Sequence, residues 1–245
     1  MRYQAAIFDM DGTVLNTLTD LCNGINYALG QCGHRHDFTE KDAALFVGSG
    51  IHVAFQRALA MEAGAAPDDL EAIGAGADVA AMSVDIKEAD RLQEVFRPYY
   101  SAHCTDMTAP YPGILELLQR LRDAGVKTAV VSNKPDYAVQ KITPDYFPGL
   151  FDLAMGEHTN VCRKPAPDMV EAALVRLGVE KEAAVYIGDS EIDVQTAANS
   201  GLACICVSWG FRGKDFLLRH GATTIVDDTR GLWDALHDLP TTCLC

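Results

Sequence analysis

The sequence predicts an α/β protein, in which a Rossmann-like parallel sheet forms the core and an all-helical cap domain is inserted into it. The chain opens with a short apolar run at residues 5–8, which is too brief for a helix and is followed by a turn-forming glycine, Gly12. From Pro110 onward, strand-like and helix-like segments alternate, which is typical of a parallel sheet with right-handed crossovers. Residues 16–97 contain no segment with strand periodicity, which indicates a domain made of helices.

Apolar periodicity and capping residues predict the helices of the insert. Residues 16–30 carry leucine and isoleucine at helical spacing. Thr39, with Asp42 three residues later, nearly matches a capping box and begins a second helix. Further helices are expected at residues 51–63, 67–73 and 84–100.

The rest of the chain predicts the strands and helices of the core. We expect strands at residues 127–131, 151–155, 184–187, 202–207 and, at the edge of the sheet, 224–226. We expect helices at residues 114–124, 135–142, 167–177, 191–199 and 232–239. Gly125, Gly178 and Gly201 each follow one of these helices, in the position where glycine commonly ends a helix.

Length and charge limit the possible organisation and partners. A chain of 245 residues fits one domain with a smaller one inserted, and we expect a core at residues 1–15 and 98–245 and a cap at residues 16–97. The 20 Lys and Arg against 34 Asp and Glu give a net charge of −14, which disfavours nucleic acid and anionic membranes as partners. We expect a cytoplasmic protein, because no apolar stretch is long enough to span a bilayer and no signal-peptide pattern is present.

The eight cysteines are too sparse for a disulfide scaffold. Cys204 and Cys206 share an apolar run, and Cys243 and Cys245 lie in the tail. Neither pair has the spacing of a zinc site with nearby histidines, so reduced thiols are expected.

Two carboxylates directly follow the first predicted strand. Asp9 and Asp11 are separated by one residue, so both side chains can project into one crevice. In open α/β sheets, ligands bind beyond the carboxyl ends of the strands, so this position suits chemistry. An aspartate-rich turn without any catalytic role has the same local pattern.

Three further segments near strand ends carry polar residues. Ser132 and Asn133 follow a strand and precede a helix, where a hydroxyl and backbone N–H groups suit an anion. Lys164 lies in a segment stiffened by prolines and could neutralise a phosphate as a point charge. Asp189 ends another strand, and Asp193 follows it by one helical turn. Taken singly, each segment also has an ordinary explanation as a turn, a solvated charge or the start of a helix.

Charge repulsion predicts a metal ion if these segments converge. Two unit charges 4 Å apart cost about 4 kcal/mol at an effective dielectric near 20. Asp9, Asp11, Asp189 and Asp193 around one crevice would repel one another strongly, and a phosphate dianion would add to this repulsion. Because every candidate ligand atom is oxygen, the expected cofactor is Mg²⁺ rather than zinc.

Together, these segments resemble the haloacid dehalogenase superfamily of aspartate-nucleophile phosphotransferases. The motifs that carry the resemblance are Asp9-x-Asp11-Gly12-Thr13, Ser132-Asn133, Lys164 and Gly188-Asp189-x-x-x-Asp193, in the family's order. The resemblance covers nearly the whole chain, and the helical insert is similar to the family's helical cap. Asn16 departs from the pattern, since many members carry an acidic residue there, but this position is on the hinge side and away from the central chemistry.

The resemblance implies roles for individual residues. Asp9 would be the nucleophile and Asp11 the acid and base. The metal ligands would be the carboxylates of Asp9 and Asp189 and the backbone carbonyl of Asp11. Asp193 would hold these ligands in place without binding the ion itself. The residues that bind the transferred phosphate would be Ser132, Asn133 and Lys164.

Specificity is expected to come from the cap, because the core contacts only the phosphate. Gly48, Ser49 and Gly50 form a compact loop whose N–H groups could meet a small carboxylate of the substrate. His52 and Arg57 are nearby cationic candidates, although a cap helix carries surface charge in any case.

The predicted function is a magnesium-dependent phosphomonoester hydrolase that acts on a small phosphorylated metabolite. The segments at residues 46–50, 131–134 and 208–210 are most similar to members that hydrolyse 2-phosphoglycolate, which is therefore the leading substrate. The alternatives are a phosphosugar mutase or pyrophosphate hydrolase on the same scaffold, and a non-catalytic phosphate-binding or receiver protein. Asp11 and the large cap argue against the receiver, which needs neither a proton shuttle nor a lid. The sequence leaves open whether the protein is a monomer or a homodimer.

Overall fold

The computed structural model describes residues 1–74, 84–159 and 161–237, and the chain divides into two compact units. The first unit comprises Met1–Asn16 and Pro110–Cys245, and the second comprises Thr17–Ala109. Cys243 and Cys245 of the tail lie outside the described residues.

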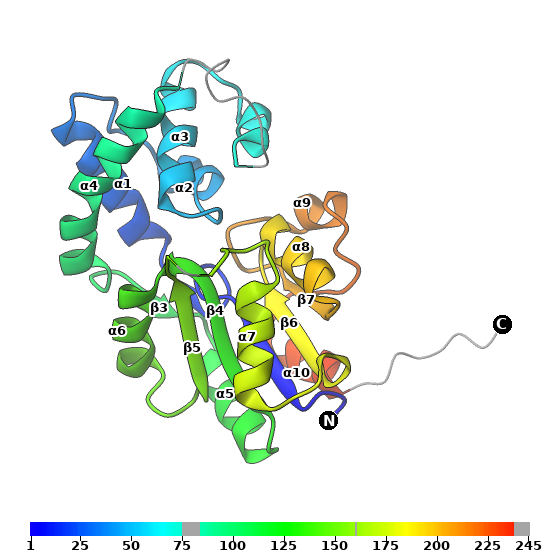
Figure 1. Ribbon diagram of the computed structural model, residues 1–245. Coiled ribbons are helices and arrows are strands. Elements are labelled where there is room, and N and C mark those ends of the chain that lie inside the picture. The colour runs from blue at the N-terminus through cyan, green and yellow to red at the C-terminus, as the bar shows by residue number, and fades with distance from the viewer. Residues whose placement is uncertain (75–83, 160, 238–245) are drawn as a thin grey trace. The chain divides into compact units, whose positions relative to one another are not determined.

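The first unit contains a parallel sheet of six strands in the order β5-β4-β1-β6-β7-β8 (Figure 1). Its strands are β1 (Ala5–Phe8), β4 (Lys127–Pro135), β5 (Leu153–Glu157), β6 (Ala184–Gly188), β7 (Ala203–Val207) and β8 (Ile225–Val226). All four residues of β1 and all five of β6 are buried, as expected for central strands covered on both faces. Every pairing in this sheet is parallel, so the carboxyl ends of the strands share one edge.

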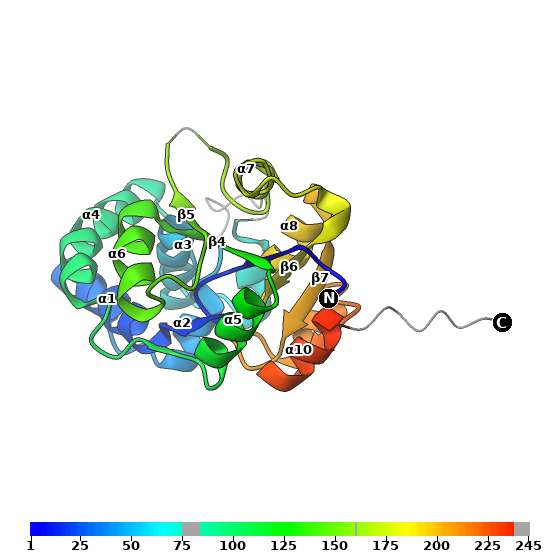
Figure 2. The ribbon, with the colours of Figure 1, turned by 90° about the horizontal axis from the view of Figure 1, so that it is seen from below.

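Helices cover both faces of the sheet. They are α5 (Ile114–Asp123), α6 (Asp136–Tyr146), α7 (Asp168–Leu177), α8 (Glu191–Ser200), α9 (Lys214–Arg219) and α10 (Thr229–His237). Figure 2 shows α7 and α8 on one face and α5 and α10 on the opposite face. Met169 and Val170 of α7 pack with Ile7 and Tyr186 in one apolar cluster, which fixes this helix against the centre of the sheet.

Several boundaries differ from the predicted ones for local reasons. β4 continues past residue 131 to Pro135, so Ser132 and Asn133 lie within the strand and not in a turn after it. α9 was not predicted, because six residues are too few to show helical periodicity. Also missed was a two-stranded sheet of β2 (Leu15–Asn16) and β3 (Ala109–Pro110), whose strands are equally short.

The second unit is helical in its described part. It contains α1 (Leu18–Gln31), α2 (Glu40–Phe46), α3 (Ile51–Glu62), a 3₁₀ helix at Pro67–Ala72 and α4 (Ile86–His103). The predicted start of α2 is confirmed: Asp42 N–H donates to Thr39 Oγ1, and Thr39 N–H donates to the Asp42 carboxylate at 2.8 Å. Within the described residues, every helix is too short or too polar to cross a membrane.

The predicted cap boundary after residue 97 falls inside α4, whereas the units divide after Ala109. The apolar stripe of α4 continues past that point, because the buried ring of Tyr100 stacks on Phe96 at 4.7 Å. Pro98 removes one helical hydrogen bond without ending the helix.

Candidate active site

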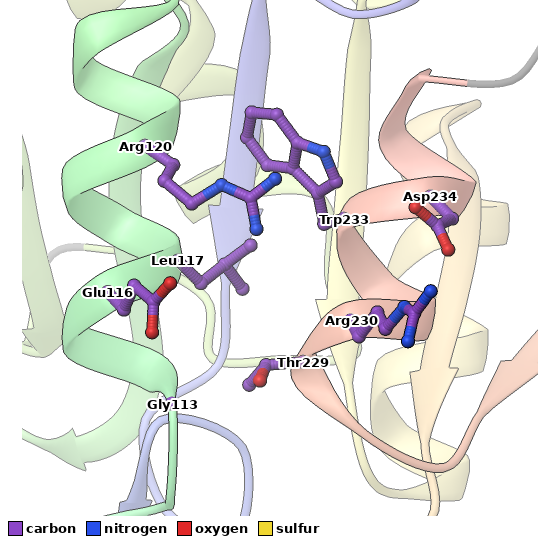
Figure 3. Close-up of a pocket in the computed structure, with 8 residues that line it drawn as sticks. All are labelled: Gly113, Glu116, Leu117, Arg120, Thr229, Arg230, Trp233 and Asp234. Atoms are coloured by element: carbon purple, nitrogen blue, oxygen red, sulfur yellow. The ribbon is translucent and has the colours of Figure 1, made fainter.

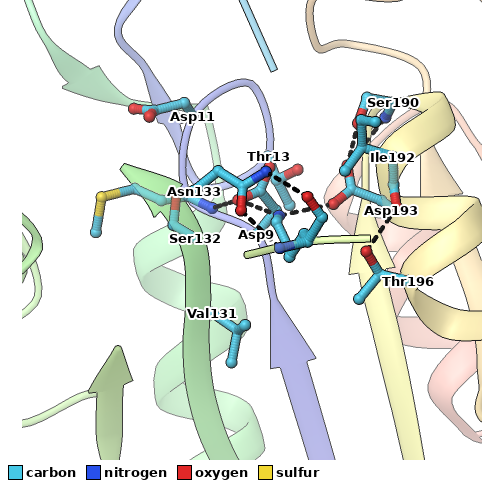
Figure 4. Close-up of polar contacts among 12 residues, drawn as sticks. Asp9, Asp11, Thr13, Val131, Ser132, Asn133, Ser190, Ile192, Asp193 and Thr196 are labelled. Atoms are coloured by element: carbon cyan, nitrogen blue, oxygen red, sulfur yellow. Dashed lines mark hydrogen bonds and ion pairs between the residues drawn. The ribbon is translucent and has the colours of Figure 1, made fainter. Parts of the chain in front are cut away.

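The structure brings most of the site residues predicted in the core domain together at the carboxyl edge of the sheet (Figure 4). Asp9 follows β1, Asp189 follows β6, and Asp193 lies in the first turn of α8. Because β1 and β6 are adjacent and parallel, their ends bring these carboxylates into one place. One oxygen from each of the three residues lies within 4.8 Å of the others, and all three residues are buried.

Lys164 is the cation at the centre of this cluster. Its Nζ lies 2.8 Å from Asp9 Oδ1 and 2.9 Å from Asp193 Oδ1, and it donates to the Tyr186 hydroxyl at 3.0 Å. The lysine side chain is 1% exposed, so these partners replace the water that an ammonium ion requires. The sequence did not predict a role for Tyr186, because a tyrosine in a buried strand is ordinarily a core residue.

The Asn133 side chain holds the backbone of Lys164 in place. The Asn133 side chain donates to the Lys164 carbonyl at 3.0 Å, and its amide oxygen accepts from the Lys164 N–H at 2.8 Å. The neighbouring Ser132 is buried, and its hydroxyl accepts from the Lys134 N–H at 3.2 Å. Phosphate binding by Ser132 and by the backbone near Asn133 stays a prediction.

Asp193 is committed to hydrogen bonds inside the protein. Its Oδ2 accepts from the Asp189 and Ser190 N–H groups, each at 3.1 Å, and from the Ser190 hydroxyl at 2.6 Å. Its Oδ1 accepts from Lys164. Asp193 therefore uses both oxygens to hold the loop after β6 and the buried Lys164 ammonium in place.

Asp189 is oriented by two hydrogen bonds from distant segments. Thr13 Oγ1 donates to its Oδ1 at 2.9 Å, and the Phe211 N–H donates to its Oδ2 at 2.7 Å. Trp209 Nε1 donates to the Thr13 carbonyl at 3.0 Å and so joins both segments. The sequence singled out Thr13 and Trp209 within motifs but predicted neither contact.

Asp11 has a different cationic partner. Lys134, at the end of β4, places its Nζ 2.9 Å from Asp11 Oδ1 and 3.3 Å from Oδ2. The lysine side chain is 2% exposed and the Asp11 side chain 19%. The sequence predicted no partner for Lys134, since only the fold brings two residues 123 positions apart into contact.

Burial dominates the electrostatics of the cluster. It raises the pKa of Asp9 to about 7; the carboxylates of Asp193 and Asp11 add to the rise, and Lys164 opposes it. Burial likewise raises the pKa of Asp189 well above its usual value, with Asp193 and Asp9 adding to the effect. Burial alone would lower the pKa of Lys164, but Asp193 and Asp9 outweigh it and raise that pKa, so the ammonium form persists.

The donor set fits a hard divalent cation. Asp9 and Asp189 offer buried carboxylate oxygens that are compensated only in part, as their raised pKa values show. An adjacent divalent cation would favour the ionised form of both groups, and oxygen-only ligands suit Mg²⁺. The backbone carbonyl of Asp11 is the third predicted ligand.

The predicted specificity residues all belong to the second unit, where the structure gives the side chains internal partners. Ser49 is buried, and its hydroxyl accepts from Arg57 Nη2 at 3.2 Å. Arg57 is 2% exposed and also donates to backbone carbonyls of its own unit. His52 Nε2 lies 3.1 Å from Asp90. Gly48 and Gly50 have φ values of 108° and 86°, so glycine is required at both positions of the loop.

A separate groove of about 380 Å³ lies between α5 and α10 (Figure 3). None of the predicted site residues lines it. The Arg120 guanidinium lies 3.7 Å from the centre of the Trp233 ring and covers its face. The groove is therefore distinct from the acidic cluster at the strand ends.

Comparison with known proteins identifies the class of protein that this fold and site define. Residues 6–207 match the model of the haloacid dehalogenase-like hydrolases, and the chain belongs to that family. The names of its relatives make it a phosphatase within the family.

The relatives are similar over most of their length. The chain is 30% identical to a phosphoglycolate phosphatase of Pseudomonas syringae pv. tomato, over 95% of this chain and 79% of that protein. It is 32% identical to a phosphoglycolate phosphatase of Cereibacter sphaeroides, over 84% and 85% of the two chains. A crystal structure from Lactobacillus delbrueckii subsp. bulgaricus, to which phosphoglycolate phosphatase activity is ascribed, has 52% identity and a TM-score of 0.92, over 96% and 99% of the two chains.

Proposed function

We propose that this phosphatase hydrolyses 2-phosphoglycolate with Mg²⁺ through an aspartyl-phosphate on Asp9. The buried contact of 2.8 Å between Asp9 and Lys164, beside Asp189, is the observation that carries the mechanism. It joins a potential nucleophile, a cation for the phosphate and a metal-binding carboxylate in one cluster. The relatives named phosphoglycolate phosphatase support the choice of substrate.

In the first step, a carboxylate oxygen of Asp9 attacks phosphorus and the bond from phosphorus to the ester oxygen breaks. Asp11 gives a proton to the departing alkoxide. Lys164 neutralises charge on the oxygens of the transferring group, and Ser132 with the backbone near Asn133 orients that group for in-line attack.

In the second step, Asp11 takes a proton from water, and the water oxygen attacks the phosphorus of the aspartyl-phosphate. The bond between phosphorus and Asp9 breaks, which releases inorganic phosphate and restores the carboxylate. When bound by Asp9, Asp189 and the Asp11 carbonyl, Mg²⁺ would supply further charge neutralisation for the phosphoryl group.

The first experiment ranks substrates by kcat/KM. The panel contains 2-phosphoglycolate, hexose phosphates, pyrophosphate and p-nitrophenyl phosphate. We expect 2-phosphoglycolate to rank first, because a site in the cap that binds the substrate's small carboxylate would add binding energy. A higher rank for hexose phosphates or pyrophosphate would contradict the substrate and favour the corresponding alternative on the same scaffold.

The second experiment replaces the nucleophile. Asp9→Asn should lower kcat by at least about a thousandfold, because no other route replaces a lost nucleophile efficiently. Asp234→Asn, an exposed substitution in the groove between α5 and α10, is the matched control and should keep full activity. Wild-type turnover in Asp9→Asn, measured on protein free of wild-type enzyme, would rule out the covalent mechanism.

A further inference from the structure

Lys134 is a buried lysine for which the mechanism above has no task. It lies in the last part of β4, next to β1 in the sheet, and reaches Asp11 beyond the end of β1. The ammonium group is 2.9 Å and 3.3 Å from the two Asp11 oxygens, so it faces both atoms that could carry the transferred proton.

Burying the Lys134 ammonium is costly, so its contact with Asp11 matters to the site. A side chain that is 2% exposed has lost nearly all its water, and burying an ammonium ion costs several kcal/mol unless a partner compensates. The backbone of Lys134 is also fixed, because it belongs to β4 and its N–H donates to Ser132 Oγ at 3.2 Å. A rigid donor therefore determines where the Asp11 carboxylate lies.

The two lysines of the site serve different carboxylates. Lys164 contacts Asp9 and Asp193, whereas Lys134 contacts Asp11. This division separates the cation that would meet the phosphoryl group from the cation that holds the acid and base.

We propose that Lys134 is a positioning residue that holds the Asp11 carboxylate in place for its two proton transfers. This inference rests on the proposed function. Lys134 keeps its own proton throughout: the proton moves from Asp11 to the leaving alkoxide, and later from water to Asp11.

A double-mutant cycle tests this role with p-nitrophenyl phosphate as the substrate. The variants are Lys134→Met, Asp11→Asn and the combination of both. We expect Lys134→Met to lower kcat by about tenfold or more, with KM changed less than twofold, since acid–base catalysis contributes about 10²–10⁴-fold in total. If Lys134 acts through Asp11, the double variant should be within twofold of Asp11→Asn.

Two variants show whether an effect of Lys134→Met comes from misfolding or from the lost charge alone. The double variant removes both charges, and Lys134→Gln keeps a hydrogen-bond donor for Asp11, so both are expected to fold even if Lys134→Met does not. Lys214→Met is the matched control, because that lysine forms an exposed pair with Asp227 at 3.5 Å, and it should show wild-type kinetics.

The possible results separate this proposal from the proposed function. Lys134 does not act through Asp11 if the kcat losses of the two single variants multiply in the double variant. The same conclusion follows if Lys134→Met raises KM and leaves kcat unchanged. Wild-type kcat in Lys134→Met and Lys134→Gln, with an impaired Asp11→Asn, would overturn the role of Lys134 and leave the proposed function intact. Wild-type kcat in Asp11→Asn would overturn the acid–base assignment itself.

Discussion

Two glycines, Gly12 and Gly210, lie close to Asp189. A Cβ added at Gly12 would lie 2.3 Å from the Asp189 carboxylate, and one added at Gly210 would lie 2.3 Å from its Cβ. Gly12 also has a φ of 88°, which favours glycine regardless of space. The two glycines allow Thr13 and the Phe211 N–H to reach the carboxylate, so they contribute to its orientation.

Gly210→Ala should therefore displace Asp189 and lower kcat on p-nitrophenyl phosphate by at least about tenfold, since about 1.4 kcal/mol of lost transition-state stabilisation is enough for that. Gly210 has an ordinary φ, so the effect would come from the contact and not from backbone strain. The control is Gly213→Ala in the same loop, where an added Cβ meets no atom within 4 Å, and its kcat should not change. Equal kcat values for the two variants would show that Asp189 tolerates displacement.

At this scale, the sequence predicted which side chains lie at the strand ends but not which partners they contact. Asp9 and Asp189 were found because each directly follows an apolar strand, which is a local pattern. The contact of Asp11 with Lys134 and that of Asp193 with Lys164 were not predicted, because residues far apart in the chain form them.

Among the elements, α3 carries a side chain that joins the ends of two others. Arg57 donates to the carbonyls of Leu45, Phe46 and Val47 at the end of α2. It also donates to Ile73 at 2.9 Å, at the end of the 3₁₀ helix. The last carbonyls of a helix have no partner within it and carry partial negative charge, so one guanidinium stabilises both ends. These contacts make Arg57 a structural residue of its unit, whereas the sequence offered it only as a cationic candidate or as an ordinary surface charge.

Arg57→Lys should lower the free energy of unfolding of the second unit by about 3 kcal/mol. An ammonium group cannot reproduce the planar set of donors, and the buried carbonyls would be left unpaired. Thermal unfolding followed by circular dichroism measures the change. Arg91→Lys is the control, because Arg91 makes an exposed pair with Glu88 and should change stability by less than about 0.5 kcal/mol. A similar loss in both variants would contradict the bridging role of Arg57.

The elements themselves were largely predictable from local pattern. The strands of the core and the capping box at Thr39 follow from apolar periodicity and cap chemistry. The prediction was wrong where the signal is short, as for α9, and the predicted cap boundary at residue 97 falls inside α4 because packing continues along that helix.

For the whole molecule, which has a net charge of −14, binding of the proposed Mg²⁺ would affect stability as well as the proposed catalysis. The acidic cluster is buried in the first unit, and burial raises the pKa values of Asp9 and Asp189, with the neighbouring carboxylates adding to the rise. A cation that binds only the folded cluster must stabilise the fold by mass action.

Removal of divalent cations with EDTA should abolish turnover, and Mg²⁺ at 100 times its Kd should add about 2.7 kcal/mol to the stability of the folded state. For a chain of this length, such a gain raises Tm by roughly 5–10 °C. Asp189→Asn should lose most of this Mg²⁺-dependent shift, because it removes a ligand charge. Full activity in EDTA, or an equal shift in Asp189→Asn, would contradict the magnesium site.

The sequence by itself determined the α/β core, the helical insert and the acids and lysine near the strand ends. These features depend on periodicity, turn residues and order along the chain, which are local properties. Only the tertiary structure decided which cation serves which carboxylate, that Asp193 is occupied by the protein itself, and that Arg57 joins helix ends. Those outcomes depend on burial, because a charge removed from water takes whatever partner the fold places within hydrogen-bond distance.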